Sequence, residues 1–137
     1  MLWVEDVEVW DMNNPVRGPD DRAWVREIVR EKMFDRLIGN IDRNQGNLHY
    51  DRDWCLILID HSRAFVGDTD PRKYQEFKFV DLQLWAKMKV LDLETLKPEL
   101  GEWVSTGMMR AMLQRRDQMA DQIDEMARTR GGNIWLR

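Results

Sequence analysis

The sequence has little of what marks secreted, disulfide-bonded or membrane-spanning proteins. Its one cysteine, Cys55, cannot form a disulfide within the chain. Because Cys55 lies in an apolar segment, we expect it to be buried as a small hydrophobic residue. The chain has no apolar run long enough to span a membrane, and its first residues are acidic, unlike those of a signal peptide. These absences favour a cytoplasmic protein with no membrane span.

A surplus of basic residues is also missing. The formal net charge is -4 at pH 7, whereas general nucleic-acid binders usually carry a positive surplus. Nucleic acid is therefore not an expected partner. Internal repeats and low-complexity segments are absent as well, and 137 residues suit one domain. We expect a single domain over residues 1–137, with residues 1–19 forming an extended or linker segment.

Helical periodicity and capping residues predict several helices. The first is predicted to begin at Asp20 or Asp21, whose side chain can accept hydrogen bonds from the first N–H groups. It runs through Arg36 and ends at Gly39-Asn40, because glycine readily adopts the left-handed conformation of a helix end. Three further helices are predicted, at residues 81–90, from Asp92 or Glu94 to residue 100, and at residues 105–128, the last capped by Ser105 or Thr106.

The last predicted helix has two kinds of side chain with different expected environments. An apolar stripe is expected to face the core, and it comprises Met108, Met112, Met119, Ile123 and Met126. Basic residues are expected to form a solvated face, and they are Arg110, Arg115 and Arg116. Gly131-Gly132 is predicted to end the helix.

A β-hairpin is predicted after the first helix. Its strands cover residues 47–50 and 55–59, and residues 51–53 make the turn. Together these elements predict an α+β fold that is mainly α, with one central β-hairpin.

The ends of this hairpin carry residues suited to phosphate chemistry. Four residues separate Asp42 from Asn47, the spacing found in kinase catalytic loops, and Asp60 follows the apolar return strand. Strand pairing is expected to bring Asn47 and Asp60 together as oxygen ligands for Mg²⁺. Asp42 is placed to accept a proton from a substrate hydroxyl. Arg43 is expected either to position phosphate or to pair with a carboxylate.

Two segments together resemble the protein-kinase-like superfamily, in particular its atypical branch of phosphatidylinositol 3- and 4-kinases and related bacterial kinases. One segment, 39–47, reads Gly-Asn-Ile-Asp-Arg-Asn-Gln-Gly-Asn, and the other, 58–65, reads Leu-Ile-Asp-His-Ser-Arg-Ala-Phe. The resemblance implies a kinase C-lobe fold whose hairpin carries the catalytic and metal loops. It implies that Asp42 is the catalytic base with Arg43 beside it, that Asn47 and Asp60 bind Mg²⁺ and ATP, and that the chain transfers phosphate.

The resemblance covers the helical lobe and leaves the nucleotide-covering N-lobe absent. The expected partners are therefore a nucleotide, a phosphate acceptor that the sequence does not identify, and a partner chain or N-lobe on the N-terminal surface. Two other functions stay open: a non-catalytic binding or scaffold module derived from a kinase fold, and a small metal-dependent phosphohydrolase. A calcium-binding EF-hand is excluded, because Gly46 comes one position early and Asp53 stands where glutamate is required.

Overall fold

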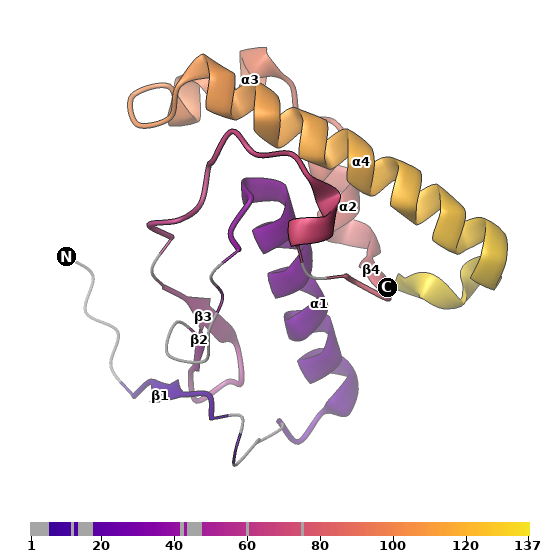
Figure 1. Cartoon of the computed structure of the whole chain (residues 1–137). Coiled ribbons are helices and arrows are strands. Elements are labelled where there is room, and N and C mark those ends of the chain that lie inside the picture. The colour runs from indigo at the N-terminus through magenta and orange to yellow at the C-terminus, as the bar shows by residue number, and fades with distance from the viewer. Residues whose placement is uncertain are drawn as a thin grey trace.

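The computed structural model describes residues 6–11, 13, 18–41, 43, 48–59, 61–74 and 76–137. Over these residues the chain is an α+β structure in which helices predominate (Figure 1). A small antiparallel sheet lies at one end of the molecule. The helices α2 (Leu82–Met88), α3 (Leu93–Leu100) and α4 (Thr106–Arg130) lie at the other end, and α1 (Asp21–Ile38) lies between them and the sheet. Even the 25-residue α4 lacks a stretch apolar enough to cross a bilayer, and the same holds for the other described helices.

Helix α1 spans Asp21–Ile38 and is bounded by the two residues that its sequence predicts. Asp20 is the N-cap, and its side chain accepts from the backbone N–H groups of Arg22 and Ala23 at 3.0 and 3.1 Å. Gly39 ends the helix with φ of 72°, a left-handed conformation that glycine adopts without a steric penalty. The predicted start is confirmed, and the helix ends at Ile38 rather than at Arg36.

The predicted hairpin is present as β2, Leu48–Tyr50, paired antiparallel with β3, Leu56–Leu58. Strand β1, Glu8–Val9, adds to the other side of β2, so the sheet order is β1-β2-β3. Leu48 lies opposite Leu58, which confirms that pairing returns the end of β3 to the start of β2. The expectation that Cys55 is buried is wrong: it precedes β3 at the turn end of the hairpin, where its side chain is exposed.

The remaining helices lie close to their predicted ranges, although the one predicted over 81–90 ends at Met88 and the one predicted over 105–128 ends at Arg130. Helix α2, Leu82–Met88, begins after Asp81, and α3, Leu93–Leu100, begins with a capping box formed by Asp92 and Thr95. Helix α4, Thr106–Arg130, is capped by Ser105, whose Oγ accepts from the N–H of Met108 at 3.2 Å. Two short 3₁₀ helices, η2 (Pro71–Lys73) and η3 (Gly131–Ile134), complete the helical elements of the described chain.

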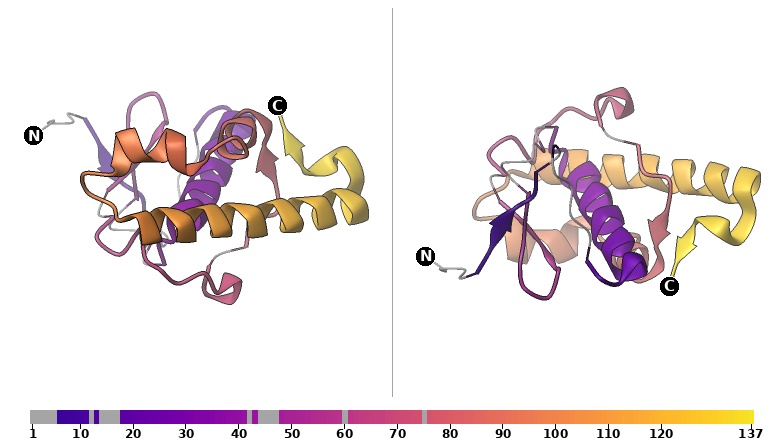
Figure 2. Two further views of the ribbon diagram at one scale, coloured as in Figure 1. Left: turned by 90° about the horizontal axis from the view of Figure 1, so that it is seen from above. Right: turned by 90° about the horizontal axis from the view of Figure 1, so that it is seen from below.

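The sequence pattern did not predict a second, two-stranded sheet. Strands β4, Val80–Asp81, and β5, Trp135–Leu136, pair in parallel. This pairing brings the C-terminal residues back beside the segment that precedes α2, as Figure 2 shows.

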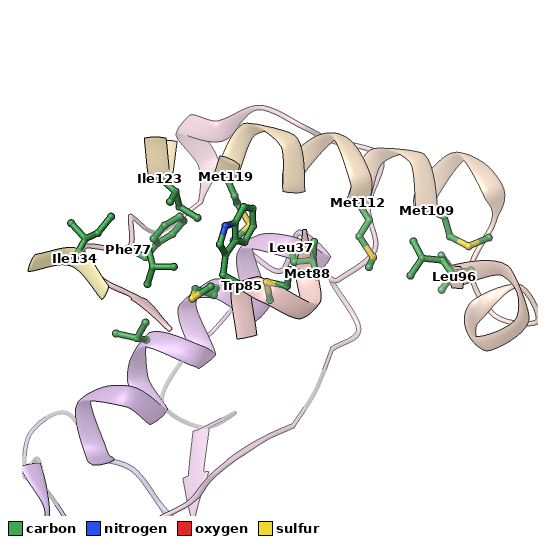
Figure 3. Packing of buried hydrophobic residues seen from close by; sticks show 14 residues of the cluster. Leu37, Phe77, Trp85, Met88, Leu96, Met109, Met112, Met119, Ile123 and Ile134 are labelled. Atoms are coloured by element: carbon green, nitrogen blue, oxygen red, sulfur yellow. The ribbon is translucent and has the colours of Figure 1, made fainter. Parts of the chain in front are cut away.

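The hydrophobic core lies where α4 crosses α1 and α2 (Figure 3). Most of the predicted stripe on α4 is confirmed, because Met112, Met119 and Ile123 are buried. Met108 is an exception: it is 41% exposed, and the adjacent Met109 is buried instead. The expected solvated face is also wrong at two positions: Arg115 is completely buried, and the side chain of Arg116 is only 15% exposed and donates to the carbonyls of Met88 and Leu91.

Candidate functional site

Of the four residues that the sequence predicts at the site, Arg43 is described by the structure. Asp42, Asn47 and Asp60 lie outside the described residues. The described geometry of this region therefore comes from the end of α1, from Arg43, and from the residues on either side of position 60.

Arg43 forms a two-pronged ion pair with Asp35 on the last turn of α1. Its Nε donates to Oδ2 and its Nη2 donates to Oδ1, both at 2.7 Å. The two side chains are nearly buried, with exposed fractions of 5% and 8%. Parallel N–H···O bonds of this kind fix both the distance and the orientation of a guanidinium. Of the two roles expected for Arg43, the described contacts show pairing with a carboxylate.

The same guanidinium also reaches the end of the hairpin. Nη1 donates to the carbonyl oxygen of Ile59 at 2.9 Å, and Nη2 lies 3.2 Å from Nε2 of His61. His61 in turn packs edge-on against the ring of Phe34, with 5.8 Å between centroids. Arg43 therefore joins α1, the loop that follows it, and the residues that flank position 60. We call this set of contacts the Arg43 clamp.

Asn40 holds the turn between α1 and Arg43 in place. Its backbone N–H donates to the carbonyl of Asp35 at 2.9 Å, and its side-chain amide donates to Oδ1 of Asp35 at 3.3 Å. The left-handed conformation of Gly39 turns the chain so that these bonds can form. Asp35 thus anchors both the turn and the clamp.

A second carboxyl group, that of Glu31, lies one helical turn before Asp35 and is buried beside it. Its Oε1 is 3.9 Å from Nε of Arg43 and has no hydrogen-bond partner among the described residues. Burial raises the pKa of Glu31 to about 8, helped by the hydrogen bond and negative charge of Asp35 and opposed by Arg43 and Lys32. Glu31 is therefore mostly protonated at neutral pH, and the Asp35–Arg43 pair is left electrically balanced.

The sequence reasoning did not identify Glu31 and Asp35 as residues of this region. The signal was available: two acids four residues apart occupy one face of a helix that also carries core side chains. Buried carboxylates require partners, and the nearest arginine beyond the helix end is Arg43.

The described residues include no group of three or more histidines, cysteines or acids that could hold a metal ion. The predicted ligands Asn47 and Asp60 are outside the residues to which this finding applies. Comparisons of the chain with protein-family models, with curated proteins and with solved structures found no match.

Proposed function

We propose that this chain is the helical half of a kinase-like phosphotransferase that acts with Mg²⁺ and ATP. In this proposal Asp42 accepts the proton of the acceptor hydroxyl, and Asn47 and Asp60 provide oxygen ligands for the metal. The observation that carries the proposal is the Arg43 clamp. One buried guanidinium is bonded to Asp35, Ile59 and His61, so it links the residue after position 42 to the residues on both sides of position 60.

Such a clamp suits phosphoryl transfer because this reaction depends mainly on positioning and on electrostatic stabilisation. The bidentate bonds to Asp35 tie the loop to a helix that is itself part of the core. Rigid elements of this kind hold reacting groups more accurately than an isolated loop does.

The proposed donor set fits magnesium chemically. Carboxylate and amide oxygens are hard ligands, and magnesium sites in nucleotide-dependent enzymes use one or two such groups together with phosphate oxygens. Bound Mg²⁺ would neutralise charge on the phosphates of ATP. A nucleotide-covering lobe, from the same polypeptide or from a partner chain, completes the cleft in this proposal.

Calorimetric titration with Mg²⁺–ATP tests the metal and nucleotide part of the proposal. We expect the wild-type chain to bind and Asp60→Ala to lose the binding, because a metal ligand has been removed. Asp53→Ala is the matched control, since Asp53 is an exposed acid at the turn of the same hairpin and should bind like wild type. Equal binding by wild type and Asp60→Ala would contradict the assignment.

A second variant separates binding from catalysis. Asp42→Asn should bind Mg²⁺–ATP as wild type does but should fail to transfer phosphate once a covering lobe is present, because the proton acceptor is missing. Metal-dependent hydrolysis of p-nitrophenyl phosphate without nucleotide would instead favour the phosphohydrolase. Absence of any Mg²⁺–ATP binding would favour the non-catalytic binding module.

A further inference from the structure

A small, partly open cavity of about 30 Å³ lies beside the Arg43 clamp. It is formed where the last turns of α1 meet the loop after Gly39 and the end of η2. Ile41 and Arg43, on either side of position 42, are both part of its wall. One water molecule needs about 10–15 Å³ measured in this way, so the cavity has room for a small ion.

The described part of the cavity wall is basic, although the whole chain carries a net negative charge. Among the described residues, its charged side chains are one carboxylate and four cations, namely Asp35, Lys32, Arg36, Arg43 and Lys73. Arg43 is neutralised by Asp35, and Lys73 forms an ion pair with Asp68. The surplus positive charge therefore comes from Lys32 and Arg36.

Arg36 is the unusual member of this wall. The residue is only 5% exposed, yet its guanidinium makes no recorded hydrogen bond or ion pair with the described residues, and its buried Nε lacks a partner. Its recorded contact is with the ring of Tyr74, 5.6 Å from the guanidinium carbon to the ring centroid. Burial lowers the pKa of Arg36, and the neighbouring Tyr74 and Glu76 oppose that change. A buried cation without a bonded anion is unfavourable, so its retention requires an explanation.

Arg115, a second buried arginine, has a structural role and can be compared with Arg36. It is also buried, but it donates from Nε to the carbonyl of Leu37 and from Nη1 to those of Val66 and Asp68, at 2.8–3.0 Å. Two of the three guanidinium nitrogens of Arg115 are thus bonded and its buried Nη2 is not, whereas Arg36 makes no hydrogen bond with the described residues. The difference points to an external partner for Arg36.

We propose that this cavity binds a phosphate dianion, either free or as the phosphate of a small phosphorylated molecule, with Arg36 as its principal hydrogen-bond donor. The planar guanidinium can bond two phosphate oxygens at once, and Lys32 adds positive charge beside it. The cavity has room for the phosphate group alone, so the rest of a phosphorylated molecule would lie outside it. The inference goes beyond the proposed phosphoryl transfer and requires neither Mg²⁺ nor ATP.

Titration with inorganic phosphate in the presence of EDTA tests this site, with sodium chloride at equal ionic strength as the reference because salt screens charge. We expect a dissociation constant of about 1 mM or lower and a perturbed Nε–Hε resonance of Arg36 in the ¹H–¹⁵N spectrum. Arg36→Gln should weaken binding about tenfold or more, and Arg36→Lys should fall between Arg36→Gln and wild type because it keeps only the charge.

The matched control is Arg110→Gln, which removes an exposed arginine from α4 and should bind phosphate like wild type. Asp60→Ala should also retain phosphate binding, so that failure of this site and failure of the proposed Mg²⁺–ATP site can be told apart. If Arg36→Gln does not fold, Lys32→Gln provides the same comparison from the rim of the cavity.

The two sources of the phosphate group are distinguished by titrating phenyl phosphate in the same way. Competition between phenyl phosphate and inorganic phosphate would support a monoester ligand, and binding of inorganic phosphate alone would support the free ion. The proposal is overturned if phosphate has no effect beyond that of sodium chloride, or if Arg36→Gln and Arg110→Gln bind phosphate equally well.

Discussion

Arg115, in the middle of α4, donates from Nε to the carbonyl oxygen of Leu37 in the last turn of α1, at 3.0 Å. The last carbonyls of a helix have no partner within the helix, so an external donor at this position stabilises the helix end. The other contacts of Arg115, with the carbonyls of Val66 and Asp68, extend the same support to the segment after the hairpin. One buried side chain therefore holds both the end of α1 and the segment after the hairpin, which adjoin the residues of the Arg43 clamp in the sequence.

Replacing Arg115 should destabilise the protein strongly. Arg115→Met removes three hydrogen bonds and leaves buried carbonyls without donors, so we expect the free energy of unfolding to fall by about 3 kcal/mol. Urea denaturation followed by circular dichroism measures this change. Arg110→Met, at an exposed position of the same helix, should change it by less than about 0.5 kcal/mol. Equal effects of the two substitutions would show that the bonds of Arg115 are unimportant.

Gly39 should be intolerant of a larger side chain for two reasons. Its φ of 72° is unfavourable for alanine, and a Cβ there would lie 2.8 Å from Cζ of Arg115. Gly39→Ala should therefore lower the free energy of unfolding by about 2 kcal/mol or more. Gly67→Ala is a suitable control, because a Cβ at Gly67 meets no atom within 4 Å and that glycine is not in the left-handed region. The melting temperatures of both variants test this prediction. An unchanged melting temperature for Gly39→Ala would contradict the expected destabilisation.

Replacing Asp35 alone should lower the free energy of unfolding less than replacing both buried acids, Asp35 and Glu31. Asp35→Asn leaves Arg43 without its carboxylate, but it also removes the hydrogen bond and negative charge that raise the pKa of Glu31. Glu31 can then ionise and partly replace Asp35. A double-mutant cycle with Glu31→Gln compares the changes in the free energy of unfolding. The double variant should be less stable than the sum of the two single changes predicts, by about 1 kcal/mol or more. Additive losses would mean that Glu31 does not compensate.

The buried Glu31 should make the protein less stable as the pH rises. Its pKa is about 8 in the folded chain and near 4.5 when unperturbed, so the folded state holds more protons between these values. This contribution is fully present below pH 4.5, decreases as the pH rises, and is lost above about pH 8. The slope can reach at most about 1.4 kcal/mol per pH unit.

Glu31→Gln should remove this part of the pH dependence, because the amide resembles the protonated acid in shape and does not ionise. Urea denaturation of both proteins at several pH values between 4.5 and 8 is the measurement. We expect the stability of the variant to exceed that of wild type increasingly toward the alkaline end. A constant difference across the range would show that Glu31 does not titrate as proposed.

Local patterns were sufficient to predict the helices and the hairpin. Asp20, Gly39 and Ser105 act on hydrogen bonds within a few residues of themselves, so their effect can be recognised without knowing the fold. The hairpin is similarly local, since a short turn joins its two strands. The parallel pair β4–β5 joins segments distant in sequence, and two residues a strand are too few to produce a recognisable pattern.

In the region of the Arg43 clamp, too, some features follow from local sequence and others depend on contacts between distant segments. The sequence by itself determined which chemically useful residues stand at the hairpin ends, and the roles of Asp42, Asn47 and Asp60 remain predictions. Only the tertiary structure decided that Arg43 pairs with Asp35, that Arg115 is buried, and that Arg36 lines a small cavity without a bonded partner among the described residues. The physical reason is that the burial and pairing of a charge depend on which distant segments pack around it, and no pattern of neighbouring residues specifies that packing.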